Sequence, residues 1–359
     1  MLQSLGQNCP DLRHREVAVC VGITPDAFSR ALSGQRRFAS VELARLSEIT
    51  GADLHWLITG EKDPNRLIVA ARHDFNHVTG KRTVPGREGD AQILEDIALA
   101  YRQGYPEPVP TRTGRWPMSP AEVRETLGSD FVRPFADRLE ECLGIDVVRV
   151  QELSTAYSLT IGGWAVIAIP ATANWFRENW DLGHELDHLV CGHHDEGISR
   201  AKADKHEAEA NAFAAELLLP AQDVHGVNWD SVSDGELAHR VWEWGVSTDA
   251  LCRRLKALDG QIPVAVAQWA AGPTQRLLRH HLAADSDYGI DKITERMDQA
   301  AQRRFPLHLQ EAHLKRIAAG AISSATLAWM LGIDPSMLEV DSPEVPEVDA
   351  DDLAAALGL

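Results

Sequence analysis

Apolar positions recur at helical spacing over most of the chain and at strand spacing over one short region. Three β-rich runs lie close together, at residues 145–150, 157–161 and 165–169, and Gly162-Gly163 forms a tight turn between the last two. After residue 179 the sequence is mostly alanine- and leucine-rich and keeps helical periodicity. This pattern predicts an α+β fold that is mostly helical and contains a small antiparallel sheet.

The pattern changes twice in the segment before the first strand run. One helix is predicted by apolar residues at helical spacing, namely Ile93, Leu94, Ile97, Ala98 and Tyr101. After it, five prolines fall within the seventeen residues 104–120, which indicates an extended linker because proline restricts its own backbone and that of the residue before it. A further helix is expected to begin near Ser119.

The sharpest chemical signal is the pentapeptide His-Glu-Leu-Asp-His at 184–188, inside a segment with helical periodicity. An apolar stripe on this segment consists of Leu182, Leu186, Leu189 and Val190. His184 and His188 share the opposite face, and two imidazoles one turn apart can bind one cation. Zinc accepts neutral imidazoles and keeps a water in catalytic sites, which Glu185 is placed to deprotonate. The alternative is an exposed helix with two solvated histidines.

A second motif follows at 207–220, with the sequence Glu-Ala-Glu-Ala-Asn-Ala-Phe-Ala-Ala-Glu-Leu-Leu-Leu-Pro. Glu207 and Asn211 lie one turn apart on a predicted helix, and the alanines of this helix allow another helix to approach closely. A carboxylate from this motif is therefore expected to reach the metal ion. Together, the two motifs resemble the ImmA/IrrE metallopeptidases, and the resemblance covers roughly residues 130–260.

That resemblance implies a thermolysin-like fold with a small three-stranded sheet, and cleavage of repressor proteins. It implies that His184, His188 and Glu207 are the zinc ligands and that Glu185 is the general base. Glu207 is favoured over Glu209 because Asn211 follows it at a spacing found in thermolysin-like sites. Asn211 is expected to orient a ligand from outside the metal's coordination sphere.

Other polar residues near the two motifs receive simpler interpretations. Asp181, one turn before His184, is expected either to bond a ligand imidazole or to act as an acid near the helix start. The sequence departs from the resembled family at Asp187, where that family usually has glycine. His193, His194 and His206 are interpreted as solvated loop histidines.

Residues 15–34 have the layout of two helices joined by a short turn. The first helix ends at Gly22, Thr24 is an N-cap, and Pro25 occupies the first helical position. Residues 1–62 as a whole resemble the xenobiotic-response-element class of helix-turn-helix repressors. The recognition helix of that class corresponds here to residues 25–32.

This second resemblance implies DNA binding, with the protein acting as a homodimer on paired half-sites. Asp26, Ser29 and Arg30 are expected to face the major groove. Arg36 and Arg37 are expected to meet phosphates. The alternative is a small helical bundle that binds protein instead, which is favoured by the equal numbers of acidic and basic residues over 1–62.

The composition of the chain limits which partners it is expected to bind and in which cellular compartment it is expected. A net charge of −18 works against general nucleic-acid affinity, so any DNA contact is confined to the N-terminal domain. No apolar stretch is long enough to span a membrane and no signal peptide is evident, which predicts a cytoplasmic protein without a membrane partner. Five scattered cysteines are expected to be reduced thiols.

Five segments result from these observations. They are a helix-turn-helix DNA-binding domain at 1–62, a helical connector and proline-rich linker at 63–120, a zinc metallopeptidase domain at 121–260, a helical C-terminal region at 261–340 and an acidic tail at 341–359. The favoured function is a zinc-dependent endopeptidase that cleaves a regulatory protein, a helix-turn-helix repressor, to control transcription. The alternative is a transcriptional repressor or antitoxin whose peptidase-like domain is a sensor with little or no proteolysis.

Overall fold

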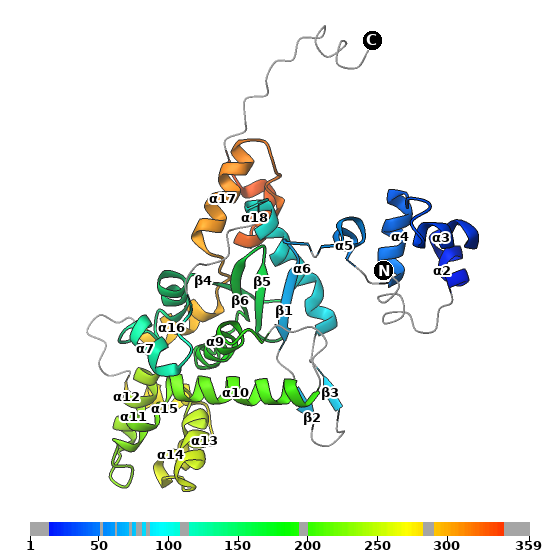
Figure 1. Ribbon diagram of the computed structural model, residues 1–359. Coiled ribbons are helices and arrows are strands. Elements are labelled where there is room, and N and C mark those ends of the chain that lie inside the picture. The colour runs from blue at the N-terminus through cyan, green and yellow to red at the C-terminus, as the bar shows by residue number, and fades with distance from the viewer. Residues whose placement is uncertain are drawn as a thin grey trace. The chain divides into compact units, whose positions relative to one another are not determined.

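The computed structural model describes residues 14–50, 53–61, 63–71, 74–76, 81–83, 87–107, 115–193, 200–282 and 291–340. The chain folds into two compact units, Met1–Arg66 and Leu67–Leu359, coloured along the chain in Figure 1. The acidic tail at 341–359 and the part of the proline-rich stretch at 108–114 lie outside the described residues. Among the described residues, no helix is long and apolar enough to cross a membrane.

The N-terminal unit is a small group of helices. They are α2 (His14–Val21), α3 (Pro25–Leu32), α4 (Ser40–Thr50) and α5 (Leu54–Thr59). Helix α3 begins where the sequence predicts, because Thr24 Oγ1 accepts a hydrogen bond from the Ala27 amide at 3.2 Å and Pro25 needs no amide partner. The buried core of the unit consists of Val17, Ala18, Val21, Phe28 and Leu46. The DNA-binding role of this unit stays a prediction.

A mixed sheet of four strands lies at the centre of the second unit. Its strands are β1 (Leu67–Ala71), β4 (Ile145–Val150), β5 (Tyr157–Ile161) and β6 (Trp164–Pro170), in the order β1-β5-β6-β4. Strand β5 is antiparallel to both β1 and β6, whereas β4 is parallel to β6. A separate antiparallel pair joins β2 (Asp74–Asn76) to β3 (Lys81–Thr83).

The expectation of a three-stranded antiparallel sheet is therefore wrong in two respects. The predicted strands exist, but β6 inserts between β4 and β5, which follow one another in the sequence. The turn at Gly162-Gly163 makes β6 antiparallel to β5, and β6 pairs in parallel with β4 on its other edge. The fourth strand, β1, comes from the segment interpreted as a connector. Local sequence patterns do not encode such insertions, because they record which residues favour strands and not which strands pair.

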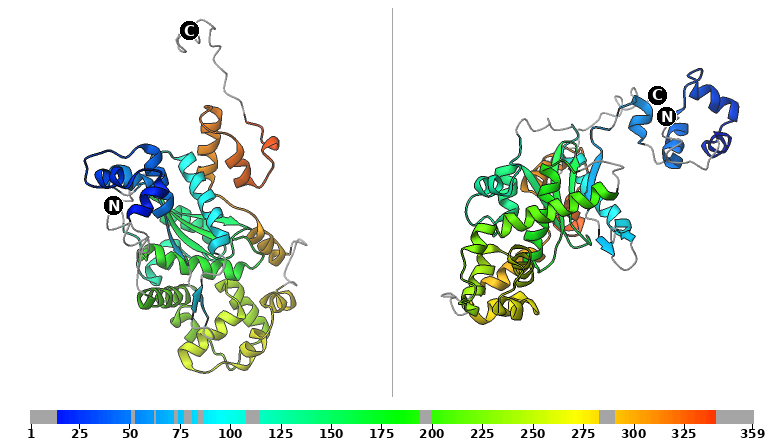
Figure 2. Two further views of the ribbon diagram at one scale, coloured as in Figure 1. Left: turned by 90° about the vertical axis from the view of Figure 1, so that its right-hand side faces the viewer. Right: turned by 60° about the horizontal axis from the view of Figure 1, so that its bottom comes forward.

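Helices cover both faces of this sheet (Figure 2). Alternate residues of β4 and β6 enter two separate cores, as the two-residue period of a strand requires. On one face, Val148 and Val166 pack with α6 (Arg87–Gly104), α17 (Leu307–Ala318) and α18 (Ala325–Leu331). On the other face, Val147 and Ile167 pack with α9 (Trp175–Val190). Burial on both faces explains why these strands are apolar at nearly every position.

The other helices of the second unit surround these cores. They are α7 (Pro120–Leu127), α8 (Phe135–Arg138), the π-helical turn η1 (Leu139–Leu143), α10 (Arg200–Leu218), α11 (Ala221–His225), α12 (Asp234–Trp244), α13 (Thr248–Asp259), α14 (Val264–Ala270), α15 (Thr274–His281), α16 (Lys292–Ala301) and the 3₁₀ turn η3 (Pro335–Met337). Helix α7 begins at the predicted Ser119, whose side chain forms a capping box with Glu122.

Two polar contacts fix the first half of α9 against its neighbours. Arg149 of β4 donates to Glu178 Oε1 at 2.6 Å, and both side chains are buried. Asn179 Nδ2 donates to the carbonyl of Gly245, at the end of α12, at 2.9 Å. Removal of one partner would leave a buried charge or amide without a counterpart, so these contacts specify the position of α9 strongly.

Gly245→Ala is expected to destabilise the protein more than Gly260→Ala. Both glycines end helices in the left-handed region, at φ of +63° and +68°, where a side chain costs roughly 1–2 kcal/mol. A Cβ at 245 would overlap Asn179 Nδ2, whereas one at 260 meets no atom within 4 Å. Overpacking should therefore lower the free energy of unfolding of Gly245→Ala by a further ~1–3 kcal/mol. Urea unfolding of both variants measures the difference, and equal losses would contradict this account.

Candidate metal centre

Helix α9 is buried along nearly its whole length because α10 covers the face that the sheet leaves open. The two helices approach closely at Gly183 and Ala214, where a Cβ built on the glycine would lie 3.5 Å from the Ala214 Cα. His184 is fully buried and His188 is 3% exposed. The alternative of two solvated histidines on an exposed helix is therefore wrong. The sequence pattern predicted the apolar stripe and a second helix able to approach closely, but not the complete burial of His184.

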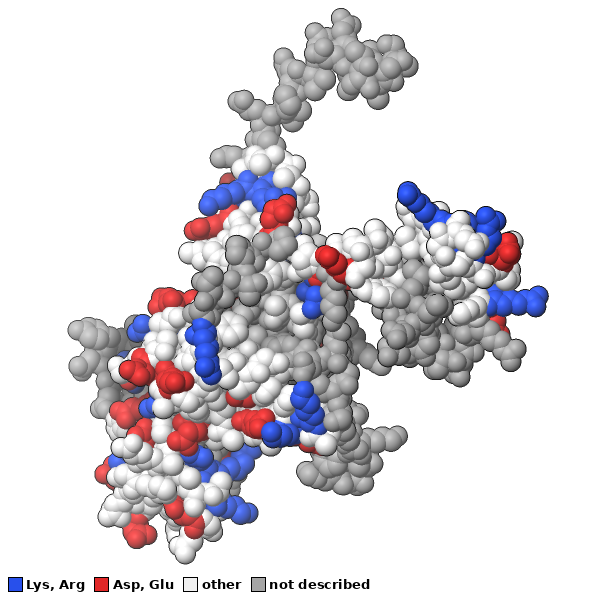
Figure 3. All heavy atoms as spheres, viewed as in Figure 1, with Lys and Arg blue, Asp and Glu red and all other residues white. Residues whose placement is uncertain are grey.

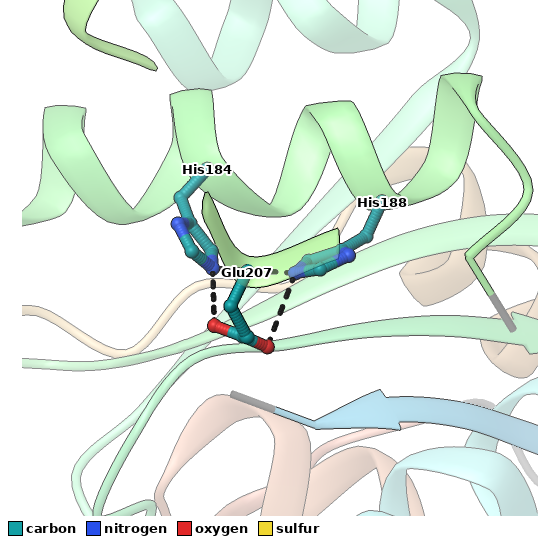
Figure 4. Close-up of side chains that lie close together, drawn as sticks. All are labelled: His184, His188 and Glu207. Carbon is teal, nitrogen blue, oxygen red and sulfur yellow. Dashed lines mark hydrogen bonds and ion pairs between the residues drawn. The ribbon is translucent and has the colours of Figure 1, made fainter. Parts of the chain in front are cut away.

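Three side chains from α9 and α10 converge in this interface (Figure 4). The Nε2 atoms of His184 and His188 are 3.2 Å apart. Glu207 directs one carboxylate oxygen to each, at 3.4 Å from His184 and 3.6 Å from His188. One ligand atom from each residue lies within 4.8 Å of the others, so the cluster could hold a metal ion. Glu209 instead forms an ion pair with Lys205 at 3.3 Å.

Glu185 lies beside this cluster and is fully buried. Among the described residues, neither of its carboxylate oxygens has a hydrogen-bond partner. The pKa of Glu185 is raised to about 7, first of all by burial. His184 and the Ser158 hydroxyl lower this pKa, whereas the nearby carboxylates of Glu207 and Asp181 raise it. A carboxyl group with such a pKa can accept and release a proton near neutral pH.

The structure places the other predicted site residues close by, in contacts of their own. Asn211 Nδ2 donates to the backbone carbonyl of Glu207 at 2.8 Å, one helical turn earlier on α10. Asp181 forms an ion pair with Arg177 at 3.2 Å, four residues earlier on α9. Their orienting roles toward a ligand stay predictions.

His193 is a close neighbour of the cluster that the sequence pattern did not indicate. Its Nδ1 lies 3.2 Å from Nδ1 of His188, its side chain is 10% exposed, and its ring stacks on His206 at 3.8 Å between centroids. The interpretation of His193 as a solvated loop histidine is wrong, and His194 lies outside the described residues. The available signal was Gly192, because a glycine after a helix commonly turns the chain back over its last turn.

The comparison with protein families agrees with this geometry. Residues 140–256 match the Peptidase_M78 family, described as an IrrE N-terminal-like domain. This segment is similar to a metallopeptidase. The match contains both motifs and spans less than half of the chain, so it supports a peptidase in this region and leaves the N-terminal unit without a family. The chain matches no curated protein and no solved structure.

The residues predicted to contact DNA all belong to the N-terminal unit. Asp26, Ser29 and Arg30 are exposed on α3, and Arg37 is exposed after it. Arg36 is engaged by Glu42 through two hydrogen bonds, of 2.6 and 2.8 Å. Figure 3 shows Lys and Arg side chains on the visible face of this unit. A phosphate would have to compete with Glu42 for Arg36, whereas Arg37 offers its charge to solvent.

The stability of chelator-treated protein is expected to depend on pH through Glu185. Because its pKa of about 7 lies above the ordinary value of 4.5, the folded state binds this proton more tightly than the unfolded chain. The resulting stabilisation is complete below pH ~4.5 and is lost as the pH rises through about 7. When the pH is raised from about 5 to about 8, the free energy of unfolding of wild type should fall by on the order of 2 kcal/mol more than that of Glu185→Gln. Urea unfolding at both pH values tests this, and parallel losses would refute it.

Proposed function

We propose that this protein is a zinc-dependent endopeptidase, joined to a DNA-binding domain, that cleaves a regulatory protein. The proposal is carried by the convergence of His184, His188 and Glu207 beside the fully buried Glu185. The similarity of residues 140–256 to a peptidase family supports the same chemistry.

The donor set fits zinc. Zinc accepts imidazole nitrogens and a carboxylate oxygen, and three protein ligands leave a coordination position open for catalysis. In this assignment His184 and His188 bind through Nε2, the atoms that face the Glu207 carboxylate. When bound, zinc polarises the substrate carbonyl and lowers the pKa of a water molecule.

Glu185 is the proposed general base. Its carboxylate oxygens have no competing hydrogen-bond partner among the described residues, so they are available to a water in the site. Glu185 takes a proton from the attacking water and delivers it to the amine of the leaving peptide. Because Glu185 is adjacent to His184 on α9, the helix itself sets the separation between base and metal ligand.

The proposed substrate is another protein with an exposed, extended segment. A peptide bond must reach a site formed by two packed helices, and folded domains offer such segments only at loops and linkers. The family that the motifs resemble cleaves repressors. We therefore assign the substrate to the class of helix-turn-helix repressors, cut in trans.

Glu185→Gln is expected to keep bound zinc and to lose hydrolysis, because the amide cannot accept the proton from water. Glu207→Gln should weaken zinc binding and lose hydrolysis as well, since an amide is a poorer zinc ligand. Glu209→Gln is the matched control and should keep both. Elemental analysis measures the zinc, expected at about one ion per chain in this site, and mass spectrometry of an incubated repressor measures cleavage. Loss of zinc in Glu209→Gln but not in Glu207→Gln would reverse the ligand assignment.

The second candidate function is a metal-binding sensor with little or no proteolysis. The observation that favours it is Asp187, a buried acid within the motif at a position where the resembled family usually has glycine. The same experiment separates the two functions. Zinc-loaded wild-type protein that cleaves no repressor, at concentrations where the complex forms, would favour the sensor.

We also propose that α3 reads DNA in the major groove and that the protein binds as a homodimer. The support is the exposure of Asp26, Ser29 and Arg30 along one short helix, with Arg37 free of the ion pair that engages Arg36. Because residues 1–62 hold equal numbers of acids and bases, attraction to the DNA phosphates contributes little to the binding affinity. That contribution therefore depends on a few basic side chains.

Replacement of Arg37 by Ala is expected to weaken binding to all DNA sequences and to reduce the slope of log affinity against log salt by about 1. Arg30→Ala should instead relax sequence preference, at a cost of roughly 1–3 kcal/mol for the preferred site. Arg36→Ala should have a smaller effect than Arg37→Ala because Glu42 already engages Arg36. Titrations at two salt concentrations test the ranking. An absence of DNA binding at low salt would favour a protein-docking role.

A further inference from the structure

A second group of metal-binding side chains lies at the C-terminal end of α9. Asp187, Cys191 and His193 place one oxygen, one sulfur and one nitrogen within 4.8 Å of one another. Cys191 Sγ is 3.5 Å from Asp187 Oδ1, and Asp187 Oδ2 is 3.6 Å from His193 Nδ1. None of these residues belongs to the triad of His184, His188 and Glu207. The group therefore has chemistry that the proposed peptidase does not use.

The backbone at the end of α9 holds this group together. Asp187 and Cys191 are one helical turn apart, and Gly192 follows with φ of +68°. The His193 amide donates to the His188 carbonyl at 2.9 Å, and the Gly192 amide donates to the Leu189 carbonyl at 3.3 Å. These two bonds form a Schellman motif, which folds the chain back over the last turn of the helix. The three side chains are thus brought together by local backbone structure.

Asp187 has a buried carboxylate that is only partly satisfied. It is 3% exposed, and its Oδ2 has no hydrogen-bond partner among the described residues. The distance of 3.6 Å to His193 Nδ1 is too long for a hydrogen bond. A buried carboxylate oxygen without a partner is costly in free energy. A cation between Asp187, Cys191 and His193 would remove that cost.

A competing group shares His193 with this one. It combines His193 with His206 and Glu209, also within 4.8 Å of one another. Glu209, however, is exposed and forms an ion pair with Lys205 at 3.3 Å. This group also lacks a sulfur ligand. The group with Cys191 is the better metal site because it combines a thiol with a buried carboxylate that has an unsatisfied oxygen.

We propose that Asp187, Cys191 and His193 bind a second divalent ion of the zinc class, separate from the ion at His184, His188 and Glu207. A thiolate with an imidazole selects zinc or a similar transition metal over magnesium or calcium. The ion binds the deprotonated sulfur, and the thiol proton is released to solvent.

His193 links the two metal sites. Its Nδ1 is 3.2 Å from Nδ1 of His188, whose Nε2 faces Glu207. A partner on the far nitrogen of a ligand imidazole orients the ring and changes its basicity. An ion on His193 therefore alters the affinity of the first site, a coupling that rests on the proposed role of His188. The second site itself does not depend on that role.

Cobalt(II) chloride is the probe, because a cobalt–thiolate bond gives a charge-transfer absorption band in the near ultraviolet that histidine and carboxylate ligands do not give. Reduced, chelator-treated full-length protein should develop this band on titration. Cys191→Ser should abolish it, and Cys252→Ser, a matched variant elsewhere in the fold, should keep it. Asp187→Asn and His193→Gln should each weaken cobalt binding at this site by at least about tenfold. Glu209→Gln should leave the band unchanged.

The first site supplies the control that separates the two proposals. Glu207→Gln should keep the band, because the sulfur site does not include Glu207. Loss of the band in Glu207→Gln would mean that Cys191 binds the ion of the first site. That result would overturn the second site. Persistence of the band in Cys191→Ser, or its absence from wild type, would also overturn it. A second measurement uses the wild-type protein. Bound zinc should protect Cys191 against an alkylating reagent and should leave the reactivity of Cys252 unchanged. Equal alkylation of Cys191 with and without zinc would count against the site.

Discussion

Helix α9 has to bury many polar groups inside an otherwise apolar unit. Fourteen of its sixteen residues are buried, and half of those are polar. They are Glu178, Asn179, Asp181, His184, Glu185, Asp187 and His188. A buried polar group without a partner costs more than most single apolar contacts contribute, so the neighbours of α9 must supply partners for this helix to fold in place. The first half receives them from Arg149 of β4 and the carbonyl of Gly245.

The second half of α9 has partners of a different chemical type. Its partners are the carboxylate of Glu207 and the imidazole of His193, which lie at 3.4 Å from His184 and 3.2 Å from His188 respectively. Acidic and imidazole groups facing one another in this way form a cluster that a divalent cation stabilises. The elevated pKa of Glu185, caused first by burial, reflects the same shortage of compensating charge. The buried acid with the raised pKa thus lies at the position where the proposed chemistry takes place.

The sheet and α10 supply the rigidity that this arrangement requires. Both faces of β4 and β6 are buried, and one of them packs directly against the apolar stripe of α9. Close contact between Gly183 and Ala214 then allows α10 to present Glu207 across the helix interface. Small residues at this contact matter because the carboxylate must reach both Nε2 atoms at 3.4 and 3.6 Å.

The sequence by itself located both motifs of the candidate metal centre, the boundaries of the helix at 25–32 and the three strand runs, because helix caps, periodicity and residue spacing are local properties. It favoured Glu207 over Glu209 by resemblance, and the fold then placed Glu207 beside both imidazoles. Only the tertiary structure decided that β6 lies between β4 and β5, that β1 joins the sheet, and that His193 returns to contact His188. These outcomes depend on pairing and packing between segments distant in sequence, and on a helix-ending turn whose side-chain contacts no local pattern records.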